Sequence, residues 1–242
     1  MTRADPARVR HPTIELAGEP LEVVPGRAVW WPRARTIFVA DTHFGKPDAF
    51  RQAGIPVPEG SARADLDRLA TLIARHGAER LVVLGDLFHA RLARPDRLHD
   101  LMAAWRDEHR SLDVLLVRGN HDRSAGDPPD KLRITCASEP VTLGPLTLLH
   151  DPAARPDSET PALAGHLHPA VTLDDPATGS RVRLPCYWLS DGLITLPAFG
   201  TFTGAKAVTP RRGDRVIAVV GGGAVHEITR FATPRGRGKR PA

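Results

Sequence analysis

The amino-acid sequence predicts an α/β fold in which two β-sheets pack against each other. In the first half, apolar runs rich in β-formers alternate with longer amphipathic segments, which is typical of parallel strands joined by helices. In the second half, many short apolar runs are separated by Gly, Pro and Asp, as in a sheet with tight turns. Because no linker separates the halves, we expect one domain over residues 1–232, followed by a short basic tail over residues 233–242.

The first half contains five expected elements in the order βαβαβ. Thr36 to Ala40 is predicted to be a buried strand, and further strands are expected at Arg80 to Leu84 and Val114 to Val117. Ser61 to Gly77 is predicted to form a helix with a serine N-cap and a glycine stop, and Pro95 to Glu108 a second helix. Helical connections of this kind predict that the three strands are parallel.

The second half is expected to form a further sheet from short strands bounded by turn residues. Two proline-rich loops, Ser124 to Lys131 and Asp151 to Pro161, lie between the expected elements. The expected strands are Val141 to Leu143, Leu146 to Leu149, Ala162 to Ala164, Arg181 to Leu189, Leu193 to Leu196, Val216 to Val220 and Val225 to Thr229.

Composition and length exclude several classes of protein. A chain of 242 residues that is 41% hydrophobic and 25% charged can bury a substantial core, which argues against general disorder. No apolar run approaches the roughly 20 residues that cross a bilayer, and the N-terminus lacks the apolar core of a secretory signal. We therefore expect a cytoplasmic protein without membrane contact. Cys136 and Cys186 are too few for a disulfide framework or a cysteine zinc site, so any metal must be bound by His, Asp or Asn.

The net charge of +5 is concentrated at the C-terminal end, after the last acid, Glu227. The five cations that follow it are Arg230, Arg235, Arg237, Lys239 and Arg240. The rest of the chain is therefore neutral. A glycine-spaced basic tail suits contacts with a phosphate backbone, and a solvated terminus that aids solubility is an equally weighted alternative.

Potential metal ligands follow the expected strands at their C-terminal ends. In "IFVADTHFGK", Asp41 and His43 come directly after a run of β-formers. Because ligands bind beyond the carboxyl ends of parallel strands, such side chains should converge on one crevice. Oxygen and imidazole donors without thiolates suit manganese, iron or zinc. The large number of these donors predicts a centre with two metal ions. The other strand-end residues are Asp86, His89, Asn120, His121, Asp122, His150, His166 and His168.

The ordered motifs resemble those of the calcineurin-like metallophosphoesterase superfamily. They are Asp41-x-His43, Gly85-Asp86, Gly119-Asn120-His121-Asp122, His150 and Gly165-His166-x-His168. Two longer strings, "FGKPDAFRQAGIPVP" (Phe44 to Pro58) and "LPAFGTFTGAKAV" (Leu196 to Val208), resemble the narrower group of bacterial DNA-ligase-associated metallophosphoesterases, the PdeM-type DNA damage response endonucleases. The resemblance implies a four-layer α/β/β/α sandwich of two mixed sheets, with a binuclear metal centre at the strand C-terminal ends.

The resemblance also implies a role for each residue of the motifs. Asp86 would bridge two divalent ions about 3.5–4 Å apart, which would activate a water for in-line attack and clamp the phosphate. His121 would stabilise or protonate the leaving oxygen, with Asp122 orienting its ring. Manganese is expected, with iron and zinc as alternatives. One ion would be bound by Asp41, His43 and His168, and the other by Asn120, His150 and His166.

Five residues near the motifs are candidate substrate contacts: Lys46, Arg51, His89, Arg118 and Arg123. A cation beside the metal loops could bind a phosphate, and a solvated loop charge is an equally simple alternative. Four other histidines lack partner motifs and are expected to be structural: His76, His99, His109 and His226. Three aromatic residues are expected in the core: Trp30, Trp31 and Phe38.

The function implied by the resemblance is that of a hydrolase, a DNA endonuclease or phosphodiesterase linked to DNA repair. Its partner would be single-stranded or damaged DNA, in association with an ATP-dependent DNA ligase, a helicase and an exonuclease. A phosphatase or phosphodiesterase that acts on nucleotides or other small phosphoesters would use the same metal centre. This function is a second alternative. A non-catalytic protein-binding scaffold of this fold is the third possibility, but such scaffolds lose ligands, whereas every ligand position is filled in this sequence.

Overall fold

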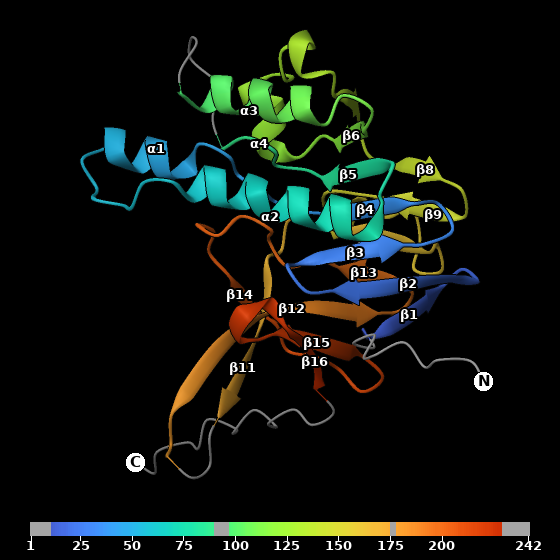
Figure 1. Cartoon of the computed structure of the whole chain (residues 1–242). Helices are drawn as coiled ribbons and strands as arrows, with labels where there is room; N and C mark the ends of the chain where they lie inside the picture. The colour runs from blue at the N-terminus through green and yellow to red at the C-terminus, as the bar shows by residue number, and fades with distance from the viewer. Residues whose placement is uncertain (1–10, 90–96, 175–177, 229–242) are drawn as a thin grey trace, which may run out of the picture.

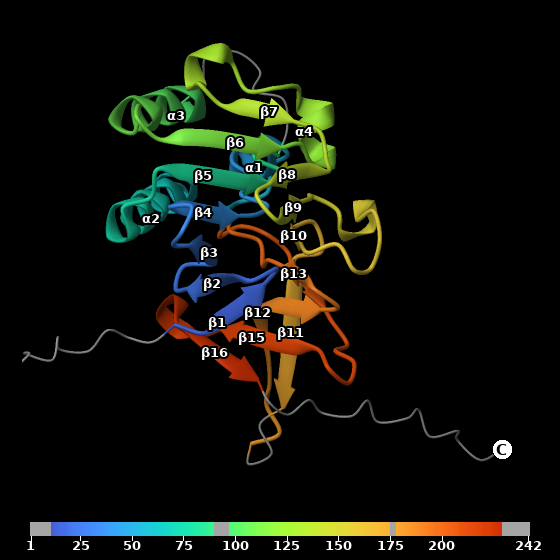
Figure 2. The same ribbon diagram turned by 90° about the vertical axis from the view of Figure 1, so that its right-hand side faces the viewer.

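The structure, a computed structural model, describes residues 11–89, 97–174 and 178–228. In these ranges the chain forms two mixed β-sheets, with α-helices packed on the first sheet (Figure 1). Figure 2 shows α2 (Ser61–His76) and α3 (Arg97–Glu108) on one side of the first sheet and strands of the second sheet on the other. The predicted combination of two mixed sheets with helices is confirmed. The basic tail at residues 233–242 lies outside the described residues.

The first sheet contains the predicted parallel strands and a further antiparallel part. β4 (Thr36–Val39), β5 (Arg80–Leu84) and β6 (Asp113–Val117) pair in parallel, which confirms the βαβαβ prediction. The sequence interpretation missed four strands that extend this sheet on both sides. They are β1 (Thr13–Leu16), β2 (Glu19–Val24) and β3 (Ala28–Trp31) beside β4, and β7 (Thr135–Ala137) beside β6.

The helices come from the first half of the described chain. α2 (Ser61–His76) and α3 (Arg97–Glu108) match the predicted helices, while α1 (Lys46–Gln52) and α4 (Asn120–Ala125) are additional short ones. The predicted serine N-cap of α2 is wrong. Gly60 is the N-cap, with a left-handed φ of 87°, and Ser61 is the first helical residue. The helix stops at Gly77 as predicted, also in a left-handed conformation.

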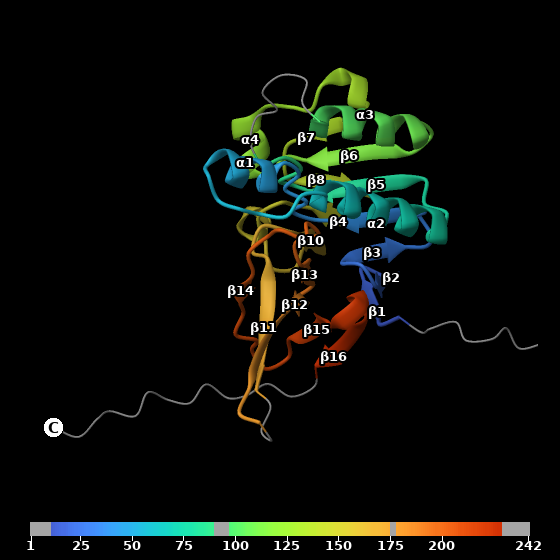
Figure 3. The ribbon, with the colours of Figure 1, turned by 60° about the vertical axis from the view of Figure 1, so that its left-hand side comes forward.

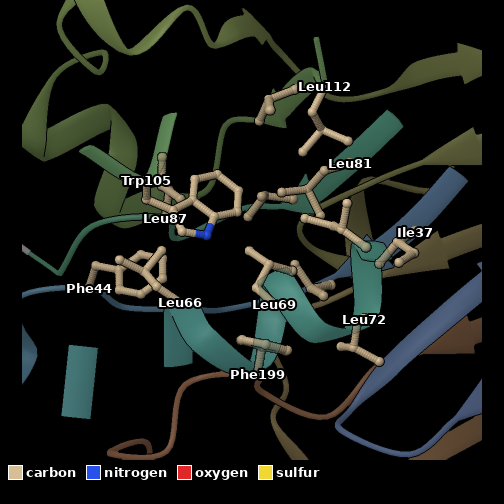
Figure 4. Close-up of a cluster of buried hydrophobic side chains, with 14 of the residues drawn as sticks. Ile37, Phe44, Leu66, Leu69, Leu72, Leu81, Leu87, Trp105, Leu112 and Phe199 are labelled. Atoms are coloured by element: carbon tan, nitrogen blue, oxygen red, sulfur yellow. The ribbon is translucent and has the colours of Figure 1, made fainter. Parts of the chain in front are cut away.

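One apolar core lies between these helices and the first sheet. Leu66, Leu69 and Leu72 of α2 face Trp105 of α3 and Leu81 of β5 (Figure 4). All five side chains are buried, and burial of each contributes roughly 1.5–3 kcal/mol relative to an exposed side chain. The periodic leucines of α2 thus hold the helix against the strands whose ends carry the metal loops.

The second sheet is built from the predicted short strands and from two that the sequence did not indicate, β11 (Pro169–Asp174) and β14 (Lys206–Ala207). β11 and β12 (Arg181–Ser190) form a hairpin that extends from the body (Figure 3). No helix in the described ranges is long and apolar enough to cross a membrane. The other strands are β8 (Val141–Leu143), β9 (Leu146–Leu148), β10 (Ala162–Ala164), β13 (Leu193–Thr195), β15 (Arg215–Val219) and β16 (Val225–Ile228).

A second apolar core joins the two sheets. Phe38 and Val82 from the first sheet share this cluster with Leu163 and Tyr187 from the second. The buried Tyr187 hydroxyl donates a hydrogen bond to the Ala28 carbonyl at 3.0 Å. Because that bond joins strands of different sheets, it fixes their relative position at the point where their apolar faces meet.

Candidate metal centre

The seven predicted ligands come together at the carboxyl ends of strands from both sheets. Asp41 and His43 follow β4, Asp86 follows β5, and Asn120 begins α4 after β6. His150, His166 and His168 follow β9 and β10 of the second sheet. The strands of the two sheets must therefore be packed together before the cluster exists.

Asp41, His43 and His168 form the first part of the cluster, with ligand atoms within 4.8 Å of one another. The Nε2 of His168 lies 3.4 Å from Oδ1 of Asp41. Asp41 is fully buried and His43 is 5% exposed. Burial, together with the neighbouring His168, lowers the pKa of His43 to about 2, so its imidazole is neutral and has a lone pair for a metal.

His150 is the centre of the second part. Its Nε2 lies 3.0 Å from Oδ1 of Asn120 and 3.0 Å from Nδ1 of His166. Asp41, Asp86 and His150 also place ligand atoms within 4.8 Å of one another. Asn120 and His166 are exposed, unlike the buried His150, so this part of the cluster opens toward solvent.

Asp86 lies between the two parts. Its Oδ2 is 3.6 Å from Nε2 of His43, and its Oδ1 is 3.6 Å from Nε2 of His150. The two oxygens of one carboxylate therefore face the two halves of the cluster. This is the arrangement in which a carboxylate can be shared by two cations.

Backbone carbonyls fix which nitrogen of two histidines faces the centre. Nδ1 of His150 donates to the Leu84 carbonyl at 3.1 Å, and Nδ1 of His168 donates to the Gly204 carbonyl at 3.1 Å. Since a carbonyl only accepts, each Nδ1 carries the proton and each neutral ring presents the lone pair of Nε2. Metal-binding histidines are commonly oriented in this way.

Two buried ligands have polar atoms without a hydrogen-bond partner within the described structure. They are Oδ1 of Asp41 and both ring nitrogens of His43. An unpartnered buried polar atom costs on the order of 1–3 kcal/mol, so it calls for a compensating group. A divalent cation accepts such oxygen and imidazole donors. The residues therefore fit a metal centre.

The glycines of three motifs provide the space that the ligands occupy. A Cβ at Gly85 would lie 2.0 Å from Nδ1 of His150, and one at Gly119 would lie 2.2 Å from Oδ1 of Asp86. A Cβ at Gly165 would lie 2.7 Å from Oδ2 of Asp41. Each glycine thus makes room for a ligand from a different strand, which ties the motifs to one another physically.

Backbone strain is concentrated at the same positions. Among the described residues, half of the ten non-glycine positions with positive φ are candidate ligands. A left-handed conformation at such residues costs about 1–3 kcal/mol and persists only where the surroundings enforce it. The five ligands are Asp41, His43, Asp86, His166 and His168, with φ between 46° and 66°.

Comparisons with known proteins agree with this geometry. A profile of the calcineurin-like phosphoesterase family matches residues 34–193. The chain belongs to this family. The crystal structure of Pseudomonas putida nuclease MPE is 39% identical, matches 90% of this chain and 100% of that chain, and has a TM-score of 0.77. YfcE, a phosphoesterase from E. coli, matches at 16% identity over 80% of this chain and 97% of its own, with a TM-score of 0.40. No curated protein matches the chain.

As a calcineurin-like phosphoesterase, the protein is a hydrolase of phosphoesters that depends on divalent metal. The resemblance to the DNA-ligase-associated group is consistent with the Pseudomonas putida neighbour. Both statements agree with the sequence predictions.

Asp122 has a different role in this phosphoesterase from the one predicted. Its carboxylate accepts hydrogen bonds from the backbone N–H groups of Asp86 (2.7 Å), Leu87 (3.0 Å) and Gly119 (2.9 Å). Burial raises its pKa, and the bond from Gly119 acts against this rise. The predicted orientation of the His121 ring by Asp122 is therefore wrong, because the carboxylate is occupied by the loop that carries Asp86.

His121 is instead held by His89. Nδ1 of His121 donates to the His89 carbonyl at 3.0 Å, and the two rings stack with centroids 5.0 Å apart. His43 packs against both rings, with centroid distances of 5.0 and 5.6 Å. His89 thus lies beside the predicted ligands, and its role as a substrate contact stays a prediction.

The four basic residues predicted to contact substrate differ in whether their side chains are already bound by other residues of the protein. Arg51 pairs with Asp48 and donates to the Pro58 carbonyl, and Arg118 makes two bonds of 2.6 and 2.7 Å to Asp127. Both guanidinium groups are thus engaged within the protein, and their role as substrate contacts stays a prediction. Arg123 lies 3.5 Å from Glu139. Lys46 forms no ion pair with another described residue, and its charge lowers the pKa of nearby His43.

Sequence reasoning missed a supporting residue, Glu139. Its carboxylate accepts from the backbone N–H groups of His150 (2.7 Å) and Asp151 (2.8 Å) and pairs with Arg123. It thereby fixes the backbone of a ligand. The sequence signal is an acid 11 residues before His150, which is too common to single out.

Proposed function

We propose that this phosphoesterase binds two divalent ions, manganese by preference, and cleaves phosphodiester bonds in single-stranded DNA. The observation that carries the proposal is the position of Asp86 between two groups of ligands. Asp41, His43 and His168 would bind one ion, and Asn120, His150 and His166 the other. When bound, the ions supply an activated water and neutralise charge on the phosphate.

His121 would pass a proton to the leaving oxygen. Because its Nδ1 is engaged by the His89 carbonyl, Nε2 is the nitrogen available for proton exchange. Lys46 would contribute positive charge next to the centre and attract a phosphate. The exposed Asn120 and His166 mark the side from which a chain of nucleotides would approach.

DNA is the proposed substrate for two reasons. The Pseudomonas putida relative, which matches 90% of this chain, is a nuclease. The net positive charge of the sequence lies in its last residues, where it suits a polyanion. We further propose a role in DNA repair, associated with a DNA ligase, a helicase and an exonuclease, on the resemblance of the two longer strings.

Removal of the bridging carboxylate tests the proposal. Asp86→Ala should lose activity on bis(p-nitrophenyl) phosphate and on a single-stranded oligonucleotide, because the two ions would lose their shared ligand. Elemental analysis should find less than the two ions per chain expected for the wild type. Chelation of the wild type should abolish both activities, and Mn²⁺ should restore them more fully than Zn²⁺.

Asp174→Asn provides a matched control, since Asp174 is an exposed carboxylate paired with Arg181 at the far end of the β11–β12 hairpin. It should retain full metal content and activity. Full activity in Asp86→Ala would contradict the two-ion centre. A wild-type protein that hydrolyses the small ester but cuts no oligonucleotide would contradict the DNA assignment alone.

A further inference from the structure

The structure brings the two longer sequence strings together beside the metal centre. Phe50 lies in α1, within the first string, and Phe202 lies in the segment before β14, within the second. Their rings meet edge to face, with centroids 5.4 Å apart and an interplanar angle of 78°. Both side chains are only half-buried, although 152 residues separate them in the chain. An edge-to-face pair stabilises the contact between the two strings by about 0.5–1.5 kcal/mol, and its half-buried rings leave part of their aromatic surface accessible.

One ring of this pair, Phe202, lies beside a predicted ligand. A small hollow is lined by Phe202, Phe44 and Pro47 together with Thr42 and the ligand His43. The apolar ring of Phe202 and the imidazole of His43 therefore border the same space. The hollow is far smaller than a base, so a base that adjoins a phosphate at the metal centre would stack on the half-exposed ring of Phe202 outside it.

Lys46 brings positive charge beside the hollow, because it lies in the chain between two lining residues, Gly45 and Pro47. The one acid that lines the hollow among the described residues, Asp65, is already paired with Arg68. Lys46 begins α1, one turn before Phe50, and its charge lowers the pKa of both His43 and His89. With no ion-pair partner in the described chain, its ammonium group is available to a phosphate. An aromatic ring and a free cation on the same short helix match the alternation of base and phosphate along a single strand.

We propose that Phe50 and Phe202 form a stacking site for one base of a single-stranded nucleic acid next to the scissile phosphate. The proposal rests on the proposed function and adds a base contact to it. Phenylalanine offers no hydrogen bond, so the site reads the flat face of any base and not its sequence. A paired base has its faces covered by its neighbours, so the site favours a single strand over a duplex.

The test separates the effect of an aromatic ring at position 202 from the effect of a large apolar side chain. Phe202→Leu keeps an apolar side chain but removes the ring, whereas Phe202→Tyr keeps the ring. Loss of one stacked base corresponds to about a 5- to 150-fold loss in affinity. We expect KM for a single-stranded oligonucleotide to rise by that factor in Phe202→Leu and to stay near wild type in Phe202→Tyr. DNA and RNA oligonucleotides are compared in parallel, since both present bases.

A second set of substrates locates the contact. Oligonucleotides with one abasic residue, moved stepwise along the sequence around the cleavage site, remove one base at a time. With the abasic residue at one particular position, KM should rise for the wild type. KM of Phe202→Leu should be the same for that abasic substrate as for the intact oligonucleotide. Ile55→Ala is the control, because it removes an exposed apolar side chain just beyond α1 that the site does not use.

The outcomes separate the two proposals. If the wild type cuts oligonucleotides and Phe202→Leu has an unchanged KM, the stacking site is wrong and the nuclease function stands. Equal losses in Phe202→Leu and Phe202→Tyr, or a loss at every abasic position, would likewise show that the ring serves packing only. If the wild type neither binds nor cuts any oligonucleotide, both proposals fail.

Discussion

At the residue scale, His121 is oriented in the same way as His150 and His168, through an Nδ1 bond to a backbone carbonyl, although it is not one of the predicted ligands. Its Nδ1 bonds to the His89 carbonyl, and its backbone N–H donates to Oδ1 of Asp86 at 2.9 Å. The ring is therefore fixed next to the carboxylate of Asp86. Stacking on His89 restricts it further. A positioned imidazole with one free nitrogen is suited to proton transfer.

His121→Ala should keep near-normal metal content and lose on the order of 10²–10⁴ in rate, the usual contribution of a positioned acid. Since nitrophenolate leaves without a proton, the loss should be smaller for nitrophenyl esters than for DNA. The measurement is kcat for both substrates alongside elemental analysis. Equal losses on the two substrates would rule out leaving-group catalysis.

The residues at strand ends could be predicted because their positions follow from the chain itself. Parallel strands bring their carboxyl ends to one edge, so Asp41, Asp86 and Asn120 had to lie close together. The direction of a side chain could not be predicted in the same way. Asp122 lies beside His121 in sequence but turns its carboxylate to backbone N–H groups, and that choice depends on the path of the neighbouring loop.

At the element scale, α2 is attached to the metal centre through the segment before β14. The buried Asp65 accepts from the backbone N–H of Thr201 at 3.0 Å and pairs with Arg68 at 2.9 Å. Arg68 in turn donates to the Phe199 carbonyl at 2.5 Å. The backbone N–H of Phe199 donates to the Ala40 carbonyl at 2.7 Å, next to the first ligand.

The same segment continues to His168. Its Gly204 carbonyl accepts from Nδ1 of that ligand at 3.1 Å. Gly200 contacts the first metal loop so closely that a Cβ there would lie 2.3 Å from the Thr42 carbonyl oxygen. Residues 199–204 thus connect the two ligands His168 and Asp41, and α2 fixes that connection through Asp65.

Asp65→Asn should therefore weaken metal binding on the side of His168 as well as stability. Loss of the charged acceptor should lower the free energy of unfolding by about 1.5–3 kcal/mol. It should also raise the Mn²⁺ concentration needed for half-maximal activity, with kcat partly restored at high Mn²⁺. Denaturant titration and activity against Mn²⁺ concentration measure the two effects.

Asp67→Asn is the matched control on the same helix. Asp67 is exposed and, among the residues that the structure describes, pairs with Arg63 alone. Its replacement should therefore change stability by less than about 1 kcal/mol and leave the metal dependence as it is. If Asp65→Asn reduces stability without changing the Mn²⁺ dependence, the segment supports the fold and does not position His168.

The elements that sequence reasoning missed share a physical cause. α1 and α4 are shorter than two full turns, so periodicity gives little signal, and Gly45 is the N-cap of α1 without a side-chain cap. β1 and β2 alternate between exposed and buried positions over only four and six residues, and β3 is a run of only four buried residues, so none of the three gives a strong signal. The long α2, by contrast, has a complete apolar face and was predicted almost to the residue.

At the scale of the whole molecule, the centre is shared between the sheets. Four predicted ligands come from the first sheet and His150, His166 and His168 from the second, so separation of the sheets would dismantle the proposed site. Bound metal therefore favours the packed state by mass action. The hydrogen bond from Tyr187 to Ala28 also stabilises the packing of the two sheets, and it does so without metal.

The last prediction concerns the charge of the whole molecule. Residues 1–228 are neutral, because all five net positive charges of the chain follow Glu227. Removal of residues 233–242 deletes four of the five cations and none of the proposed ligands, so turnover of bis(p-nitrophenyl) phosphate should barely change. If the tail contacts backbone phosphates, affinity for DNA should fall, and the slope of log affinity against log salt should shrink by about 0.7–0.9 per lost contact. Salt titrations of single- and double-stranded oligonucleotide binding measure this slope for intact and truncated protein. An identical slope in the two proteins would exclude the tail from DNA binding and leave that task to the surface around the metal centre.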